Sequence, residues 1–146
     1  MTIKELKRLQ QNVLQLQKNC EQVLASEDLQ QLKSVFTYKG PHDISLSICR
    51  KTNGDYKGCS FSSEQALADL TAGDEDNLKV MQHIIALMSR DYVKLSDCIE
   101  GYIFKLKERR KQACKDFWKS FAGSILPWIV AALPYCERII TALLNR

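Results

Sequence analysis

Residues 78–106 read LKVMQHIIALMSRDYVKLSDCIEGYIFKL and decide the fold class of this chain. Apolar and aromatic side chains recur there at alternating steps of three and four residues, the pattern of a long amphipathic helix. The positions are Leu78, Met81, Ile85, Met88, Tyr92, Leu95, Ile99, Tyr102 and Leu106. Ile84, Val93, Ile103 and Phe104 widen this stripe beyond a two-stranded coiled-coil seam. The segment is therefore predicted to be the central helix of a bundle, with one side facing a partner.

A shorter seam of the same kind lies near the N-terminus. Thr2 and Glu5 have the spacing of a capping box, which predicts that a helix begins there. Steps of three and four residues then join Leu6, Leu9, Val13, Leu16, Cys20 and Val23. This periodicity fits packing within one chain and coiled-coil pairing between chains alike. We predict self-association through Leu6, Leu9, Val13, Leu16 and Val23 of this seam and Leu78, Met81, Ile85, Met88, Tyr92, Leu95 and Ile99 of the longer one.

The segment between the two seams is predicted to hold a second helix and a hairpin. Ser26-Glu27-Asp28 is typical of a helix start, and Lys39-Gly40-Pro41 of a helix end. Residues 43–61 change period, because Ile44, Leu46 and Ile48 alternate with Ser45, Ser47 and Cys49. Asn53-Gly54 favours a two-residue hairpin turn, which would place Ile48 opposite Cys59 and Leu46 opposite Phe61.

The fold class follows from these elements. We predict one mainly α-helical domain, a bundle of five or six helices with long heptad-patterned helices, one small β-hairpin at about 43–61 and an apolar C-terminal helical segment. Residues 1–39 hold the N-terminal helices. Residues 62–119 hold a short helix, which begins at Ser62-Ser63 and closes at Ala72-Gly73, and the long helix, with Asp74-Glu75-Asp76 at its start. Residues 120–146 are the apolar segment.

The C-terminal third joins a strongly basic stretch to an uncharged one. Residues 105–119 carry seven cations, namely Lys105, Lys107, Arg109, Arg110, Lys111, Lys115 and Lys119, and no charge occurs from Ser120 to Cys136. The residues predicted to insert or to be buried are Phe117, Trp118, Phe121, Ile125, Leu126, Trp128, Ile129, Val130 and Leu133. Cations, then aromatic residues, then an apolar run is the order expected at an anionic membrane interface.

Two structures for the apolar segment remain open. Pro127, Pro134 and the Glu137-Arg138 pair argue against a simple membrane span, which leaves a tail anchor or an in-plane or re-entrant element. The alternative is a helix pair buried in the bundle or in an oligomer, with Pro134 as the first residue of the last helix.

The chemistry-bearing residues give no catalytic, cofactor or metal site. The two histidines, His42 and His83, have no metal-ligand spacing, and the glycines form no phosphate-binding loop. The six cysteines include no Cys-x-x-Cys pair and follow no secretory signal. We therefore expect free thiols in a cytoplasmic protein, at the inner face of the membrane if the C-terminal segment binds lipid. A disulfide between Cys49 and Cys59 is disfavoured because the hairpin places them on opposite faces.

Composition bounds the function without naming it. The chain has 146 residues, 45% of them hydrophobic, and a net charge of +4, with a pI of about 8.7. This is ordinary globular composition, and it is less basic than a typical nucleic-acid-binding domain. Nucleic acid is therefore an unlikely partner, and nucleic-acid binding is the last of three interpretations of the function. The first is a non-enzymatic adaptor, inhibitor or assembly subunit that self-associates and binds a protein. The second is a membrane-anchored or membrane-active effector that uses residues 105–119 and 120–144.

Overall fold

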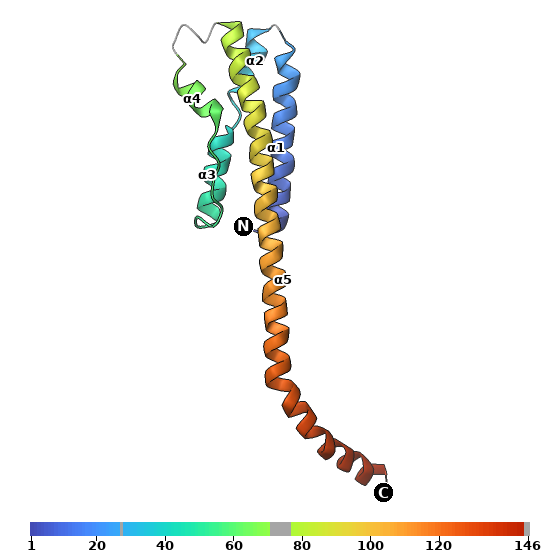
Figure 1. Ribbon diagram of the computed structural model, residues 1–146. Coiled ribbons are helices and arrows are strands. Elements are labelled where there is room, and N and C mark those ends of the chain that lie inside the picture. The colour runs from blue at the N-terminus through green and yellow to red at the C-terminus, as the bar shows by residue number, and fades with distance from the viewer. Residues whose placement is uncertain (27, 71–76, 145–146) are drawn as a thin grey trace. The chain divides into compact units, whose positions relative to one another are not determined.

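All the secondary-structure elements in the described part of the chain are α-helices. The computed structural model describes residues 1–26, 28–70 and 77–144, except for the side chains of Ile139 and of residues 142–144. Its helices are α1 (Ile3–Leu24), α2 (Leu29–Val35), α3 (Pro41–Lys51), α4 (Ser62–Ala68) and α5 (Leu78–Leu144). They form two compact units, Met1–Lys105 and Leu106–Arg146, and α5 contributes to both (Figure 1). The predicted mainly helical fold is confirmed.

In the first unit, α1 runs antiparallel to the first part of α5 (Figure 1). The capping box is confirmed at the start of α1: the Glu5 N–H donates to Thr2 Oγ1 (3.2 Å), and the Thr2 N–H donates to the Glu5 carboxylate (2.6 Å). Gln10 Nε2 donates to the hydroxyl and the carbonyl oxygen of Ser96, both at 3.4 Å. Gln82 Nε2 donates to the Ser26 carbonyl at the other end of the pair (3.5 Å).

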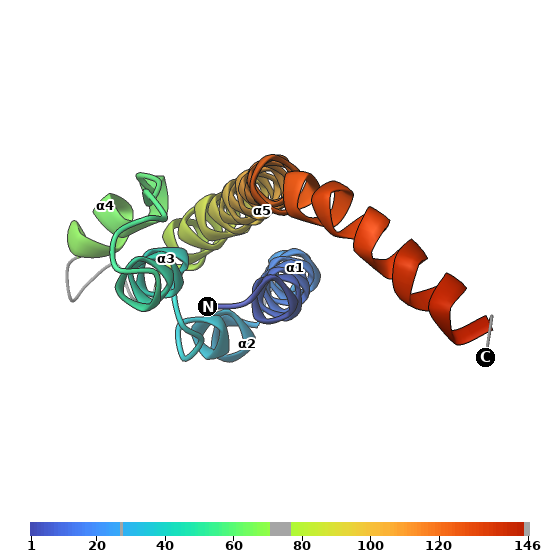
Figure 2. The same cartoon turned by 90° about the horizontal axis from the view of Figure 1, so that it is seen from below.

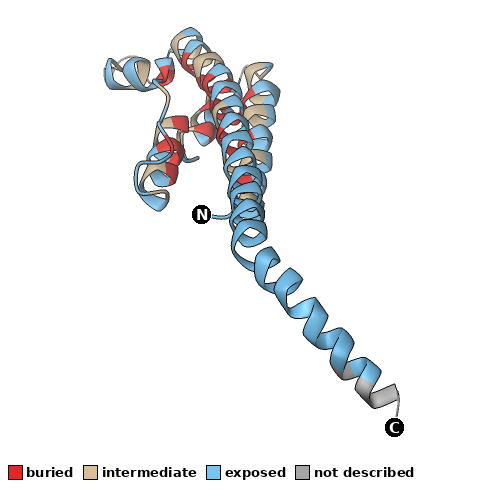
Figure 3. Ribbon diagram, turned by 60° about the horizontal axis from the view of Figure 1, so that its bottom comes forward, coloured by how far each residue is buried: buried red, intermediate tan, exposed pale blue. Residues whose placement is uncertain are grey.

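Both heptad seams lie in the core of this unit. Leu6, Val13 and Cys20 of α1 are fully buried, as are Ile85, Tyr92, Leu95 and Ile99 of α5, with Met81 and Met88 nearly so. Figure 3 shows the buried residues on the inward sides of these helices. The remaining predicted seam residues, Leu9, Leu16, Val23 and Leu78, are partly exposed. The spacing that fitted two modes of packing therefore serves packing within one chain.

The predicted β-hairpin is wrong, because residues 41–51 form α3 and the described residues contain no strand. Ile44 and Ile48 are four residues apart, so they share a face in a helix just as they do in a strand. Burial separates the two: Ser45 is buried and Leu46 is 38% exposed, the reverse of the predicted alternation. Pro41 is tolerated at the first turn of a helix, where its missing N–H costs nothing.

The local sequence signals around α3 do mark turns and helix ends, but some of them belong to a different element from the predicted one. Asp28 caps the start of α2 by accepting from the Gln30 N–H (2.9 Å), as the predicted helix start required. Pro41 opens α3 rather than closing α2, which ends at Val35. Asn53 and Gly54 have positive φ angles of 51° and 78°. They form a tight turn after α3, where the Gly54 N–H donates to the Cys49 carbonyl (2.9 Å), and not a turn between strands.

A buried carboxylate of α5 holds the start of α4. Asp91 Oδ2 accepts from the Ser63 N–H at 2.7 Å, and both residues are buried. The predicted helix start at Ser62 is confirmed, but the helix ends at Ala68, earlier than the predicted end at Ala72-Gly73. Residues 72–76, with the predicted closing pair and the charges at 74–76, lie outside the described residues. Lys94 Nζ donates to the Ser60 carbonyl (2.7 Å), close to the same junction.

The loop between α3 and α4 is tied to α5 by side chains and by a disulfide. The Tyr56 and Tyr102 rings meet edge to face at 5.5 Å, and the Tyr102 hydroxyl donates to Asp55 Oδ2 (3.0 Å). Cys59 and Cys98 are disulfide-bonded. The expectation of six free thiols is therefore wrong for this pair, since folding brings together cysteines 39 residues apart. Cys20, Cys49, Cys114 and Cys136 are free.

The second unit consists of one helical segment. α5 continues through Pro127 and Pro134, so the prediction that Pro134 begins a separate helix is wrong. A proline inside a helix removes one backbone hydrogen bond and bends the helix axis. The ribbon of this segment does bend, in its orange-to-red part (Figure 1). The apolar segment is thus one bent helix and not a helix pair.

Candidate functional site

The second unit presents an uninterrupted run of exposed side chains. From Lys107 onward every described side chain is exposed (Figure 3). The large apolar residues among them are Phe117, Trp118, Phe121, Ile125, Leu126, Trp128, Ile129, Val130, Leu133, Tyr135 and Ile140, and Trp128 is 77% exposed. Contiguous apolar surface of this kind is rare in monomeric soluble proteins and marks an interaction site.

These side chains cover more than half of the helix circumference. Each residue turns the helix by about 100°. Phe117, Phe121, Trp128 and Tyr135 are therefore nearly aligned. We call Phe117, Trp118, Phe121, Ile125, Leu126, Trp128, Ile129, Leu133, Tyr135 and Ile140 the apolar face. The opposite side, the small-residue face, carries Ser120, Gly123, Pro127, Pro134, Arg138 and Thr141. The helix is thus amphipathic, with a broad apolar face and a narrow face that holds a single cation.

Three aromatic rings cluster where the apolar face begins. The ring centres of Phe117 and Phe121 are 6.0 Å apart and stacked, and Trp118 meets both edge to face, at 6.0 and 5.7 Å. Trp118 and Trp128 are the two tryptophans of the chain. Aromatic residues with a polar ring atom favour the boundary between water and an apolar phase. The tryptophan fluorescence of this protein, excited selectively at wavelengths where tyrosine does not absorb, therefore reports on its apolar face.

The basic block, Lys105–Lys119, lies on the same helix and overlaps the start of the apolar face at Phe117 and Trp118. It carries seven cations and two carboxylates. One of the cations, Lys111, pairs with Glu108 at 2.9 Å, with side chains 70% and 50% exposed. An ion pair this exposed contributes little free energy, since water and salt screen it. The cations spread around the helix, so the block is hydrated on every side and presents positive charge in all directions.

The structure separates the predicted site residues into two groups. The seam residues lie in the first unit and are buried there, fully or in part. The basic block and the apolar face lie on one continuous helix, as their order in the sequence implied. Tyr135 and Ile140 extend the apolar face beyond the predicted set, and their helical spacing from Trp128 and Ile129 was the signal for them.

Two kinds of site are absent from the described residues. They contain no cluster of three or more His, Cys, Asp or Glu side chains that could hold a metal ion. Within the described ranges, no helix combines the length and the apolarity needed to cross a bilayer.

Comparison with protein-family models, with curated proteins and with solved structures gives no match to this chain.

Proposed function

We propose that this chain is a non-enzymatic interaction protein that attaches to anionic membranes through its C-terminal helix, which lies in the plane of the bilayer surface. The observation that carries the proposal is the exposed apolar face between Phe117 and Ile140, whose start overlaps a block of seven cations. An amphipathic helix of this kind buries its apolar side at the boundary between headgroups and acyl chains. The small-residue face would then remain in contact with water and headgroups.

Two energetic terms favour this placement. Burial of one large apolar side chain contributes about 1.5–3 kcal/mol. Each Lys or Arg close to an anionic leaflet contributes about 1 kcal/mol more. Because the basic block and the apolar face belong to one helix, both terms act on the same binding event. Attachment should therefore require anionic lipid and should weaken as salt screens the cations.

Assembly of several copies through the same face is the competing function. Most of the seam residues predicted to mediate it are buried in the first unit, so the exposed apolar face of the C-terminal helix is the larger apolar surface that remains for such contacts. A coiled-coil seam is a narrow stripe at heptad spacing, whereas this apolar face exceeds half of the circumference. Two prolines within eight residues also disturb the regular backbone that knobs-into-holes packing needs. Both features favour a fluid apolar phase over a second helix.

Tryptophan fluorescence of the full chain tests the proposal directly. The protein is titrated with vesicles of phosphatidylcholine, with and without phosphatidylserine. Because both tryptophans lie on the apolar face, insertion should shift their emission to shorter wavelength and protect them from acrylamide. The proposal would be excluded if vesicles that contain phosphatidylserine neither shift the tryptophan emission nor sediment the protein.

Charge variants test the role of the basic block. Replacing Arg109, Arg110 and Lys111 by glutamate should weaken vesicle binding by about 100-fold or more, since three cations near the surface contribute about 3 kcal/mol. The matched control replaces Lys4, Lys7 and Lys18 of α1, which are also exposed, and changes the net charge equally. Equal losses in both variants would show that net charge, and not the block, governs binding.

Variants of the two faces test the orientation of the helix. Trp128→Glu places a charge on the apolar face, and Ser120→Glu places one on the small-residue face. The first should abolish insertion, and the second should leave it nearly unchanged. Light scattering of the same variants without lipid tests self-association. A discrete oligomer that Trp128→Glu dissociates, without vesicle binding by the parent chain, would support assembly instead.

A further inference from the structure

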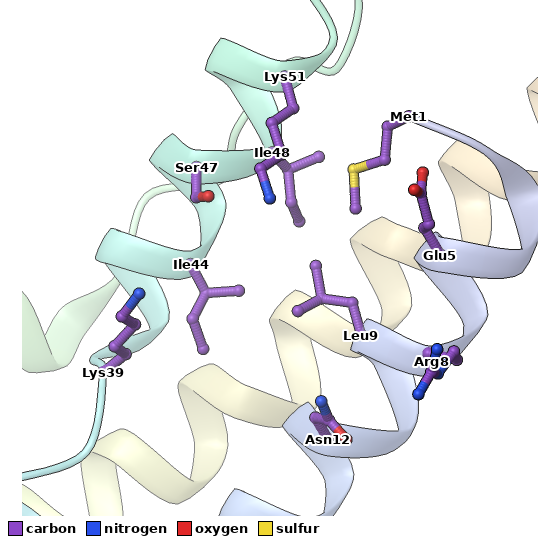
Figure 4. Close-up of a pocket in the computed structure, with 10 residues that line it drawn as sticks. All are labelled: Met1, Glu5, Arg8, Leu9, Asn12, Lys39, Ile44, Ser47, Ile48 and Lys51. Carbon is purple, nitrogen blue, oxygen red and sulfur yellow. The ribbon is translucent and has the colours of Figure 1, made fainter.

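A groove opens in the first unit between α1 and α3, with a volume of about 620 Å³ (Figure 4). The views in Figure 1 and Figure 2 both place the N-terminus between α3 and the start of α1. The groove extends along one side of α1, from Met1 to Asn12, and along α3 from Ile44 to Lys51. Its volume is within the range of small-molecule sites, which commonly lie between the helices of bundles.

The floor of the groove is apolar. Met1, Leu9, Ile44 and Ile48 line it, and Figure 4 shows their side chains directed into the opening. Ile48 is 1% exposed and Ile44 7% exposed. Both isoleucines are thus largely covered by protein, and most of the apolar surface open to a ligand is a narrow strip formed by Met1, which is 37% exposed, and by the partly exposed Leu9. A narrow strip of this kind suits a slender ligand, such as one unbranched alkyl chain.

The rim of the groove is positively charged. Arg8, Lys39 and Lys51 line it, together with one carboxylate, Glu5. Glu5 already accepts a hydrogen bond from the Thr2 N–H, so part of its capacity is used within the capping box. Asn12 and Ser47 add uncharged polar groups to the lining. Three cations against one occupied carboxylate favour an anionic ligand.

We propose that this groove binds a single-chain amphiphile with an anionic head, such as a fatty acid. The alkyl chain lies over Met1 and Leu9 and against the edge of Ile44, and the anionic head group lies among Arg8, Lys39 and Lys51. Charge-assisted hydrogen bonds from lysine or arginine to a carboxylate or phosphate are the strong kind. All the residues that line the groove belong to the first unit, so this site does not depend on the function proposed for the C-terminal helix.

Calorimetry on the full chain with dodecanoate as the probe tests this site. Dodecanoate should bind with a stoichiometry of one, whereas dodecanol lacks the charge and butyrate lacks the chain, so both should bind at least about 10-fold more weakly. Dodecyl phosphate distinguishes a lipid phosphate from a free carboxylate as the preferred head group. Methyl NMR should show shifts at Ile44 and Ile48, which locates the ligand in the groove.

A pair of adjacent residues provides matched variants. Lys51 and Arg50 are both exposed and both lie in the last turn of α3, but only Lys51 lines the groove. Lys51→Glu should weaken dodecanoate binding by about 10- to 100-fold, and Arg50→Glu should change it by less than about twofold. Ser47→Phe fills the groove without changing charge, and it should block binding while the protein remains folded.

Adsorption to the apolar face is the outcome that would overturn the proposal. Both tryptophans lie on the C-terminal helix, so dodecanoate in the groove should leave their emission unchanged. Dodecanoate binding that shifts the tryptophan emission and is lost in Trp128→Glu, equal binding of dodecanol, or equal losses in Lys51→Glu and Arg50→Glu would each exclude a specific anion site in the groove. Loss of vesicle binding in Trp128→Glu with dodecanoate binding retained would show that the two sites are independent.

Discussion

The carboxylate of Asp91 on α5 caps α4 by accepting a hydrogen bond from the backbone N–H of Ser63, 2.7 Å away. The residue at the cap position of α4 is Phe61, which has no side-chain acceptor. Asp91, which lies 28 positions beyond Ser63 in the chain, therefore supplies the acceptor that the local sequence lacks. This contact fixes a short helix that would be marginal on its own.

Removal of this cap should destabilise the first unit. Asp91→Ala leaves the buried Ser63 N–H without an acceptor and should lower the free energy of unfolding by about 1–3 kcal/mol. Asp91→Asn keeps an acceptor oxygen and should cost less. Urea denaturation followed by circular dichroism measures both. Equal stability of the alanine variant and the parent would show that α4 does not depend on Asp91.

Reduction of the disulfide should lower stability more than any single hydrogen bond. Cys59 and Cys98 are 39 residues apart, and a crosslink over a loop of that size stabilises the folded state by about 4 kcal/mol in the chain-entropy description. Unfolding in urea should therefore shift to lower concentration in dithiothreitol. The Cys114→Ser, Cys136→Ser variant keeps this shift, since those thiols are exposed. Six titratable thiols in the unreduced, denatured protein would contradict the pairing.

The buried thiol of Cys20 should be the least reactive of the free cysteines. Burial raises the pKa of Cys20 to about 11, because the thiolate is poorly solvated there. At pH 8 about one Cys20 side chain in a thousand is then ionised. Iodoacetamide should modify the exposed Cys114 and Cys136 first, as peptide mass spectrometry can show. In urea the protection of Cys20 should disappear, and its persistence there would rule out burial as the cause.

Truncation of a seam residue tests whether the seam belongs to one chain. Ile85 is fully buried, so Ile85→Ala should cost about 2–5 kcal/mol. Val93, on the same helix but 42% exposed, provides the control, and Val93→Ala should change stability by less than about 0.5 kcal/mol. The unfolding midpoint of both variants should not depend on protein concentration. A midpoint that rises with concentration would place Ile85 between chains.

The sequence alone determined the helices that have strong local signals. Steps of three and four residues identified α1 and the first part of α5, and the Thr2–Glu5 box located the start of α1. These signals suffice because side-chain periodicity and capping act over one or two helical turns. The juxtaposition of the basic block and the apolar face was also visible in the sequence, since one continuous helix keeps sequence neighbours adjacent in space.

Tertiary structure decided what local pattern left ambiguous. Ile44 and Ile48 fit the buried face of a strand and of a helix equally, and contact with the rest of the first unit resolved that ambiguity toward α3. The Cys59–Cys98 bond, the Asp91 cap and the groove between α1 and α3 join residues far apart in the chain. No periodicity encodes such pairs, because they depend on how helices pack against one another and not on the spacing of residues along any one of them.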